Sequence, residues 1–186
     1  MRIISGELKG RSINFLKSSK TRPLKDKVKE SIFNILQHSN VINKKVKNSN
    51  ILDLYSGIGS FGIECISRGA KKATFVEQEK SAGSILKENL VKLSIFDRCK
   101  IHIDKIENFL AEVKNEKYDI FFFDPPFSDF NFLQNLEMIK KKKFFKKNHV
   151  LVIHRERGTI DKLEDLMITL ETKQYGRSKI IFGIFN

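Results

Sequence analysis

Residues 50–62 read NILDLYSGIGSFG, an apolar run followed at once by a cluster of glycines. A short apolar run, a glycine turn and the helix-like segment Phe61–Ser67 are typical of a strand–turn–helix unit. Gly57, Gly59 and Gly62 match the pattern G-x-G-x-x-G, which in this context favours a nucleotide-type ligand at the turn. The stretch therefore predicts the first unit of an α/β sheet and the place where that sheet binds its ligand.

The same alternation of apolar runs and helical patterns continues to the C-terminus. Unbroken apolar strands separated by helices indicate a mainly parallel sheet that is covered on both faces. The last two strands follow each other around Gly176 without a helix, which indicates an antiparallel hairpin at one edge. One α/β domain with a seven-stranded sheet is therefore predicted over residues 50–186. Strands are expected at 51–55, 73–77, 100–103, 118–124, 149–154, 167–175 and 179–186, and helices at 61–67, 80–93, 106–113, 130–142 and 161–166.

The N-terminal part of the chain shows a different pattern. RIIS at 2–5 and RSINF at 11–15 read as two short strands, joined through GELKG, whose glycines suit a hairpin. Asp26 is expected to cap a helix that runs to about Gln37. Residues 1–40 are therefore predicted to form a separate extension made of a β-hairpin and a helix.

Positive charge is concentrated in the same part of the chain. The protein has 35 Lys and Arg against 22 Asp and Glu, a formal net charge of +13. Residues 1–50 hold 12 of the basic residues and 3 of the acidic ones, and the polar stretch 39–49 is the best linker candidate. This imbalance favours a polyanionic partner, nucleic acid first, in contact with the extension. A solvated lysine-rich surface, or a lysine bias in overall composition, would give the same counts.

The remaining composition limits the class of protein. Cys65 and Cys99 have no metal-type spacing and suit reduced, buried thiols, and the four histidines do not cluster with them, so no metal site is predicted. No apolar run is long enough to span a bilayer, and the first residues have no apolar signal core. We therefore expect a cytoplasmic protein without a membrane partner, and a monomer.

Candidate ligand-binding residues follow from the sheet. Ligands of open α/β sheets bind beyond the carboxyl ends of the strands, next to the point where the strand order reverses. Those ends are the last residues of the first four predicted strands and the residues that follow them. The candidates are Asp53, Tyr55, Gly57, Gly59 and Phe61, then Glu77 and Gln78, then Asp104, and finally Asp124–Phe127.

Asp53 decides which nucleotide-type ligand fits best. A carboxylate four residues before Gly57 would repel a pyrophosphate at the turn, but it suits a cation. S-adenosylmethionine carries a sulfonium and an ammonium and has no phosphate. Glu77 would then accept both ribose hydroxyls, Gln78 would border the adenine, and Asp104 could accept from its amino group. Two alternatives stay open. In the first, Asp53 caps local backbone groups and Asp104 caps the following helix. In the second, the turn belongs to a nicotinamide-dependent oxidoreductase.

The segment YDIFFFDPPF at 118–127 ends a buried strand on an acid and two prolines. The Asp124 carboxylate and the Pro125 carbonyl offer two acceptors that could hold the two N–H bonds of an exocyclic amine. Pro125 and Pro126 fix φ and lack an N–H, so they stiffen this loop. Phe127 offers a face on which a base can stack. The alternative interpretation is a proline-rich turn in which Asp124 is only a turn-former.

Several segments resemble one family. DPPF at 124–127 is similar to the (D/N)PP(Y/F) motif of amino-directed methyltransferases. RIISGELKGRSI at 2–13, RPLKDKVKESIFN at 22–34 and DLYSGIGSFGIECISRGA at 53–70 resemble stretches of the RsmD-type enzymes, which methylate guanine N2 in bacterial small-subunit ribosomal RNA. The resemblance runs from the first residues to about Phe127, and more loosely beyond.

The resemblance implies a Rossmann-like, S-adenosylmethionine-dependent methyltransferase fold with an RNA-contacting N-terminal extension. It implies guanine 966 of 16S rRNA, in a nearly assembled small subunit, as the target. It places Arg11, Arg22 and Lys29 near the RNA or the cofactor entry, and ordinary surface charge is the alternative for each of them. Departures from the family pattern are Lys where members often have Arg, an offset after strand three that affects Asp104, and His154 where members often have an acid. The remaining alternatives are an adenine-N6 DNA methyltransferase and a non-catalytic rRNA-binding assembly factor.

Overall fold

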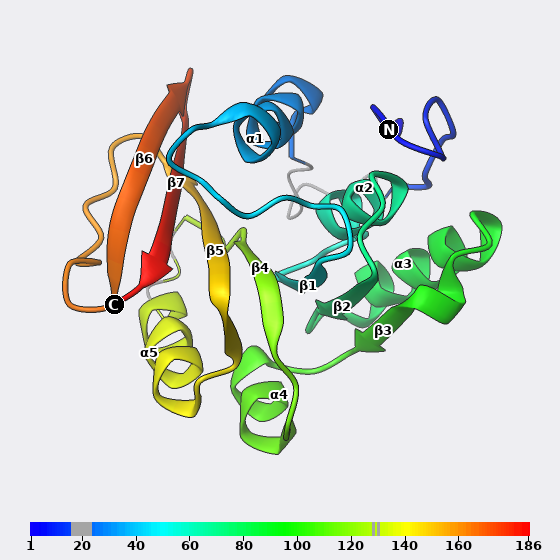
Figure 1. Ribbon diagram of the computed structural model, residues 1–186. Coiled ribbons are helices and arrows are strands. Elements are labelled where there is room, and N and C mark those ends of the chain that lie inside the picture. Colours follow the sequence, from blue (N-terminus) through cyan, green and yellow to red (C-terminus); the bar gives the residue numbers. More distant parts are fainter. Residues whose placement is uncertain (16–23, 128, 130) are drawn as a thin grey trace.

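Seven strands form one sheet in the order β3-β2-β1-β4-β5-β7-β6, as Figure 1 shows. The computed structural model describes residues 1–15, 24–127, 129 and 131–186. Strands β1 to β5 are parallel, and β7 lies antiparallel between β5 and β6. The predicted seven-stranded sheet with its C-terminal antiparallel hairpin is therefore confirmed. The strands are β1 (Asn50–Leu54), β2 (Lys72–Val76), β3 (Cys99–His102), β4 (Tyr118–Phe123), β5 (Phe145–Glu156), β6 (Met167–Tyr175) and β7 (Ser178–Phe185).

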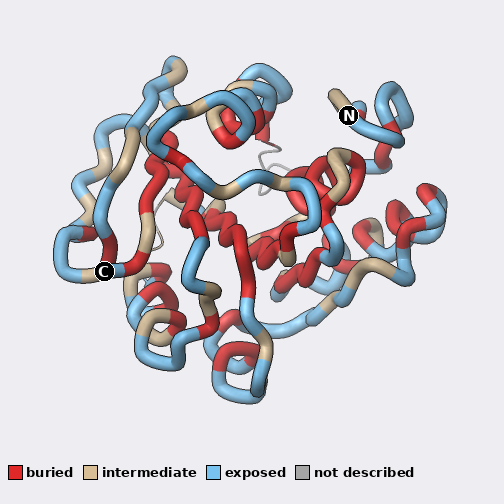
Figure 2. Tube along the Cα trace, in the orientation of Figure 1, coloured by how far each residue is buried: buried red, intermediate tan, exposed pale blue. Residues whose placement is uncertain are grey.

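Helices cover both faces of the sheet. Along β4, Ile120 and Phe122 pack into the core on one face, and Phe121 and Phe123 pack into the core on the other. This alternation follows from the period of two in a strand. Figure 2 shows the central strands buried over most of their length, with the start of β5 at the surface. Helices α1 (Asp26–His38), α2 (Ser60–Ser67) and α3 (Lys80–Lys92) lie on the first face, and α4 (Ile106–Glu112) and α5 (Phe132–Lys142) lie on the second (Figure 1).

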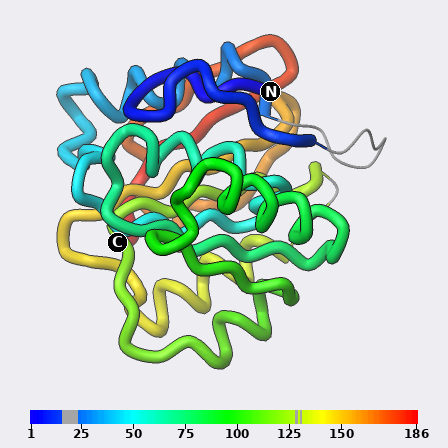
Figure 3. Tube along the Cα trace, turned by 90° about the vertical axis from the view of Figure 1, so that its right-hand side faces the viewer, coloured from blue at the N-terminus to red at the C-terminus, as the bar shows by residue number. Residues whose placement is uncertain are grey.

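The N-terminal segment is a turn with one bridge rather than a pair of strands. Arg2 and Ser12 form a single antiparallel bridge, so the prediction of two strands at 2–5 and 11–15 is wrong. The two stretches still share backbone hydrogen bonds, such as that from the Ile3 amide to the Arg11 carbonyl at 3.0 Å, and the segment is also bonded to α2. The amides of Ile4 and Ser5 donate to the Glu64 carboxylate at 2.8 and 2.9 Å. The segment therefore lies on the α1–α2 side of the sheet, as the turned view in Figure 3 shows.

Three local predictions are wrong in detail. Asp26 lies in the first turn of α1, whose N-cap position is Lys25, and no side chain caps that end. Residues 161–166 form a loop that ends in a turn at 164–166, rather than a helix. Strand β5 begins at Phe145, four residues before the expected start. The predicted polar loop at residues 18–22 lies outside the described residues. None of the helices in the described ranges has the length and apolarity that a membrane span needs.

Candidate functional site

The glycine turn leaves β1 at the carboxyl edge of the sheet. Gly57 and Gly59 have φ of 52° and 85°, in the region that favours glycine. A Cβ at Gly59 would lie 2.4 Å from the Leu86 side chain, whereas a Cβ at Gly57 would meet nothing within 4 Å. The Gly57 amide donates to Oε2 of Glu77 at 2.7 Å. The turn is thus packed against α3 at one glycine, open at the other, and tied to the end of β2.

Asp53 is buried beneath this turn. Its Oδ2 accepts a hydrogen bond from the Gly62 amide at 2.9 Å, so Asp53 does bond local backbone, as one alternative proposed. Burial raises the pKa of the Asp53 carboxyl well above its usual range, and the nearby charges of Asp124 and Glu77 raise it further. Acids from the ends of β1, β2 and β4 therefore lie close enough to interact. A cation among them would relieve this repulsion.

The Asp124–Phe127 loop leaves β4 at the same edge. Leu54 at the end of β1 pairs with Phe123 at the end of β4, so the glycine turn and this loop start side by side. The Asp124 side chain is 23% exposed, and its Oδ1 lies 2.7 Å from Nδ1 of His154. Pro125 is buried, Pro126 is exposed, and the half-buried Phe127 ring stands edge-on to His154, with centroids 5.9 Å apart.

The other candidate cofactor residues lie nearby with different exposure. Glu77 also accepts from the Glu79 amide through Oε1, so each of its oxygens holds one backbone N–H and keeps a second acceptor position. Gln78 is exposed. Asp104 is exposed too, and its Oδ1 accepts from the Lys105 amide and the Asn108 side chain at the start of α4. This bonding favours the helix-start interpretation of Asp104 over an adenine contact.

Two aromatic candidates are tied into the protein. Phe61 is 2% exposed and is stacked between Phe33 and Phe122, with ring centroids 5.2 and 4.0 Å away. The prediction that the Phe61 ring contacts the cofactor is therefore wrong, because the ring fills the core between α1 and β4. Tyr55 has a φ of 60°, and its hydroxyl accepts from the Asn135 amide. Burial raises the pKa of the Tyr55 hydroxyl.

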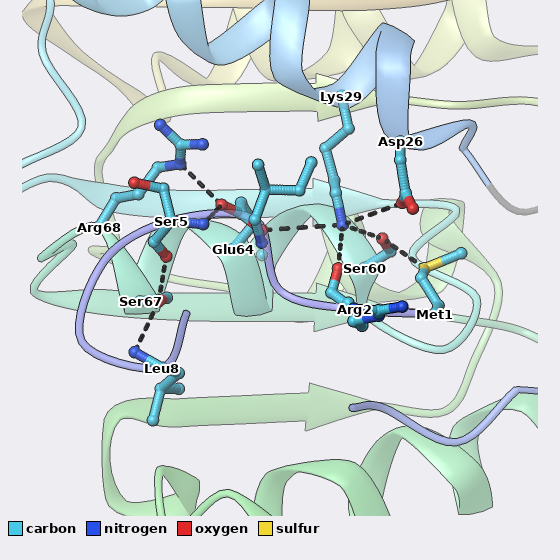
Figure 4. A network of polar contacts seen from close by, with 12 residues as sticks. Met1, Arg2, Ser5, Leu8, Asp26, Lys29, Ser60, Glu64, Ser67 and Arg68 are labelled. Carbon is cyan, nitrogen blue, oxygen red and sulfur yellow. Dashed lines mark hydrogen bonds and ion pairs between the residues drawn. The ribbon is translucent and has the colours of Figure 1, made fainter. Parts of the chain in front are cut away.

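The predicted RNA contacts have different outcomes. Lys29 is 1% exposed, so the prediction that it contacts RNA is wrong. It lies on the inner face of α1 and forms an ion pair with the buried Glu64 at 3.7 Å (Figure 4). Burial lowers the pKa of the Lys29 ammonium, which Glu64 opposes. Arg11 is exposed and donates to the carbonyls of Lys92 and Leu93 at the end of α3. Arg22 lies outside the described residues.

Sequence reasoning missed two residues at the end of β5. His154 bonds Asp124, and Arg155 donates to the carbonyls of Pro126 and Phe127 at 3.2 and 3.3 Å. A signal was present, because two polar residues end an apolar strand that is the parallel neighbour of β4. Because Phe123 pairs with Ile153, the next residues of β5 lie beside the residues that follow β4.

The comparisons with known proteins show the family. A family model described as "Conserved hypothetical protein 95" matches residues 1–184. The chain belongs to this family. "Ribosomal RNA small subunit methyltransferase D" of Buchnera aphidicola subsp. Acyrthosiphon pisum is 36% identical over 155 residues, which is 83% of this chain and 78% of the relative. The resemblance to the RsmD-type enzymes is therefore confirmed.

Solved structures show the same fold. A putative methyltransferase of Escherichia coli has a TM-score of 0.85 at 23% identity, over 100% of this chain and 98% of its own. An RNA methyltransferase of Salinibacter ruber, solved in complex with S-adenosyl-L-homocysteine, has a TM-score of 0.64 at 12% identity, over 89% of this chain and 95% of its own. The chain therefore has the Rossmann-like fold of the class I methyltransferases, as predicted.

Proposed function

We propose that this protein transfers a methyl group from S-adenosylmethionine to the exocyclic N2 of a guanine in small-subunit ribosomal RNA. One observation carries the proposal: the Asp124–Phe127 loop and the glycine turn leave neighbouring strands at one edge of the sheet. A methyl donor held at the turn would face an amine held at the loop. Family membership supports the reaction class, and the name of the Buchnera relative supports the RNA class.

The residues at the turn fit S-adenosylmethionine. Asp53, Glu77 and Asp124 place three carboxyl groups within interaction distance, which suits a ligand with two positive charges and no phosphate. The second acceptor positions of Glu77 suit the two ribose hydroxyls. The open space above Gly57 lets a ligand approach the backbone. When bound, the cofactor supplies an activated methyl group on a sulfonium.

The loop residues would hold the guanine. Oδ1 of Asp124 is bonded to His154, and the second oxygen can accept one N–H of the amine. The Pro125 carbonyl can accept the other, so the nitrogen lone pair is aimed at the methyl. Phe127 offers a stacking surface that offsets the cost of extruding the base, a few kcal/mol. The chain then acts by proximity and orientation, and Asp124 or water takes the proton after transfer.

Charge supports a ribosomal substrate. The net charge of +13 favours RNA, and residues 1–50 hold 12 of the 35 Lys and Arg. A ribosomal substrate also implies a cytoplasmic enzyme. The guanine at position 966 of 16S rRNA is the target that family resemblance favours.

The test is transfer of labelled methyl from S-adenosylmethionine to small ribosomal subunits, naked 16S rRNA and DNA. Mass spectrometry then locates the modified nucleotide. We expect N2-methylguanine in the small subunit, and its loss in Asp124→Ala. Cofactor binding by that variant should fall far less than transfer, because Asp53 and Glu77 remain at the turn. Asp97→Ala, an exposed acid, is the matched control. Label in DNA adenine would favour the N6 alternative. Tight, salt-sensitive RNA binding without any transfer would favour an assembly factor.

A further inference from the structure

Strand β5 delivers a polar side chain to the target-base loop from one face of the sheet. Phe123 of β4 pairs with Ile153 of β5, so Asp124 and His154 are the next residues on two parallel strands. Their side chains point to the same face. Nδ1 of His154 accordingly lies 2.7 Å from Oδ1 of Asp124, and the imidazole is nearly buried.

The other ring nitrogen of His154 is also bonded. Nε2 lies 2.9 Å from the hydroxyl of Ser178, at the start of β7. With that hydroxyl donating to Nε2, the ring proton sits on Nδ1 and points at Asp124; this tautomer is assigned from the two bonds. This bond holds Oδ1 of Asp124. Because both oxygens belong to one planar carboxylate, it limits the rotation of the group and so fixes Oδ2 as well.

Arg155 reaches the same loop from the opposite face. Its side chain is fully buried, donates to the carbonyls of Pro126 and Phe127, and pairs with Asp161 at 3.1 Å. The guanidinium also lies over the ring of Phe132, at 4.5 Å. Asp161 comes from the segment that was expected to be a helix. A buried ion pair that also satisfies backbone carbonyls is well placed to fix a loop.

We propose that His154 and Arg155 are positioning residues that clamp the Asp124–Phe127 loop from both faces of the sheet. His154 fixes the acceptor side chain, and Arg155 fixes the two carbonyls that follow Pro125. The Pro125 carbonyl, the second acceptor for the amine, lies between the two held points. The inference rests on the proposed function. In this proposal the two β5 residues hold the loop in its shape, so that both acceptors for the amine are in place before the base arrives.

The first test compares two replacements of His154. Leucine has a similar volume and no donor, whereas the amide nitrogen of asparagine occupies nearly the place of Nδ1 and can still donate to Asp124. His154→Leu should lower kcat about 10- to 100-fold, with KM for S-adenosylmethionine and the Tm little changed. His154→Asn should recover most of the rate. A rate for His154→Leu within threefold of the wild type, or an asparagine variant as slow as the leucine variant, overturns the His154 part.

The second test concerns Arg155. Arg155→Lys keeps the charge, but one ammonium cannot replace a fork that reaches two carbonyls and Asp161. We expect a lower kcat and faster hydrogen exchange of the Asp129 amide, which donates to the Pro126 carbonyl. Unchanged protection of that amide overturns the Arg155 part. If the wild-type protein transfers no methyl to small subunits, the proposed function fails, while amide exchange in the same variants still decides whether the clamp exists.

Discussion

Replacing Glu64 by alanine should destabilise the protein more than any surface change, because one buried carboxylate joins three parts of the chain. Glu64 is fully buried in α2. It accepts from the amides of Ile4 and Ser5 and from Nε of Arg68, and it pairs with the buried ammonium of Lys29 (Figure 4). The substitution removes all four interactions at once.

The size of the effect follows from these contacts. Removing one partner of a buried ion pair costs about 3–5 kcal/mol, because the other charge is left uncompensated. Ile4 and Ser5 are half-buried, so water can take over part of their bonding and adds little to that figure. For a chain of this size the cost corresponds to a fall in Tm of about 6–20 °C. Adding Lys29→Met should restore part of the loss, since it removes the unpaired ammonium.

Urea unfolding followed by circular dichroism gives the free energies, and hydrogen exchange follows the Ile4 and Ser5 amides. Glu88→Ala, an exposed acid on α3, is the matched control and should change stability by less than about 0.5 kcal/mol. A loss below about 1 kcal/mol for Glu64→Ala would refute the reasoning. So would unchanged exchange at Ile4 and Ser5, because the N-terminal segment would then be held by other contacts.

Three further substitutions test the site. Asp53→Asn keeps an acceptor for the Gly62 amide but weakens S-adenosylmethionine binding at least about 10-fold by calorimetry. Because the folded-state pKa of Asp53 is raised, its ionisation costs stability as pH rises through that pKa; the variant should melt higher than wild type at pH 7 but not near pH 3. Phe127→Ala should slow single-turnover transfer about 5- to 150-fold, from about 1–3 kcal/mol of stacking. Gly62→Ala puts a Cβ 2.3 Å from the Phe75 ring, and should cost about 1–3 kcal/mol in urea unfolding.

Each of these has a contradicting result. Equal cofactor affinity in Asp53→Asn would mean that the buried acid serves only the backbone of α2. An unchanged single-turnover rate in Phe127→Ala would remove the stacking role. Wild-type stability in Gly62→Ala would show that the Phe75 ring can move aside.

The sheet could be predicted from the sequence because its strands carry their own signal. Tyr118–Phe123 is buried at all six positions, and only a strand covered on both faces needs such a run. The carboxyl-edge rule then led to Asp53 and Asp124, which interact. These inferences use local pattern and topology, and neither requires knowledge of side-chain packing.

The remaining features depend on partners distant in sequence. Lys29 reads as surface charge, and only the placement of Glu64, 35 positions later, explains its burial. Asp161 would suit a helix start, but Arg155 draws its carboxylate inward. The N-terminal segment has strand-like residues, yet α2 supplies the acceptors that bind its backbone. No local pattern encodes these choices.

The three acids at the sheet edge also bear on how the enzyme would release its spent donor. In the proposed reaction the sulfonium becomes a neutral thioether, so the by-product has lost one of the two charges that Asp53, Glu77 and Asp124 attract. Burial raises the pKa of the Asp53 carboxyl, so loss of the sulfonium favours its neutral form, which holds the product less strongly. Turnover itself would thus loosen the product, and the same carboxyl groups would favour exchange for a fresh donor, which carries one positive charge more.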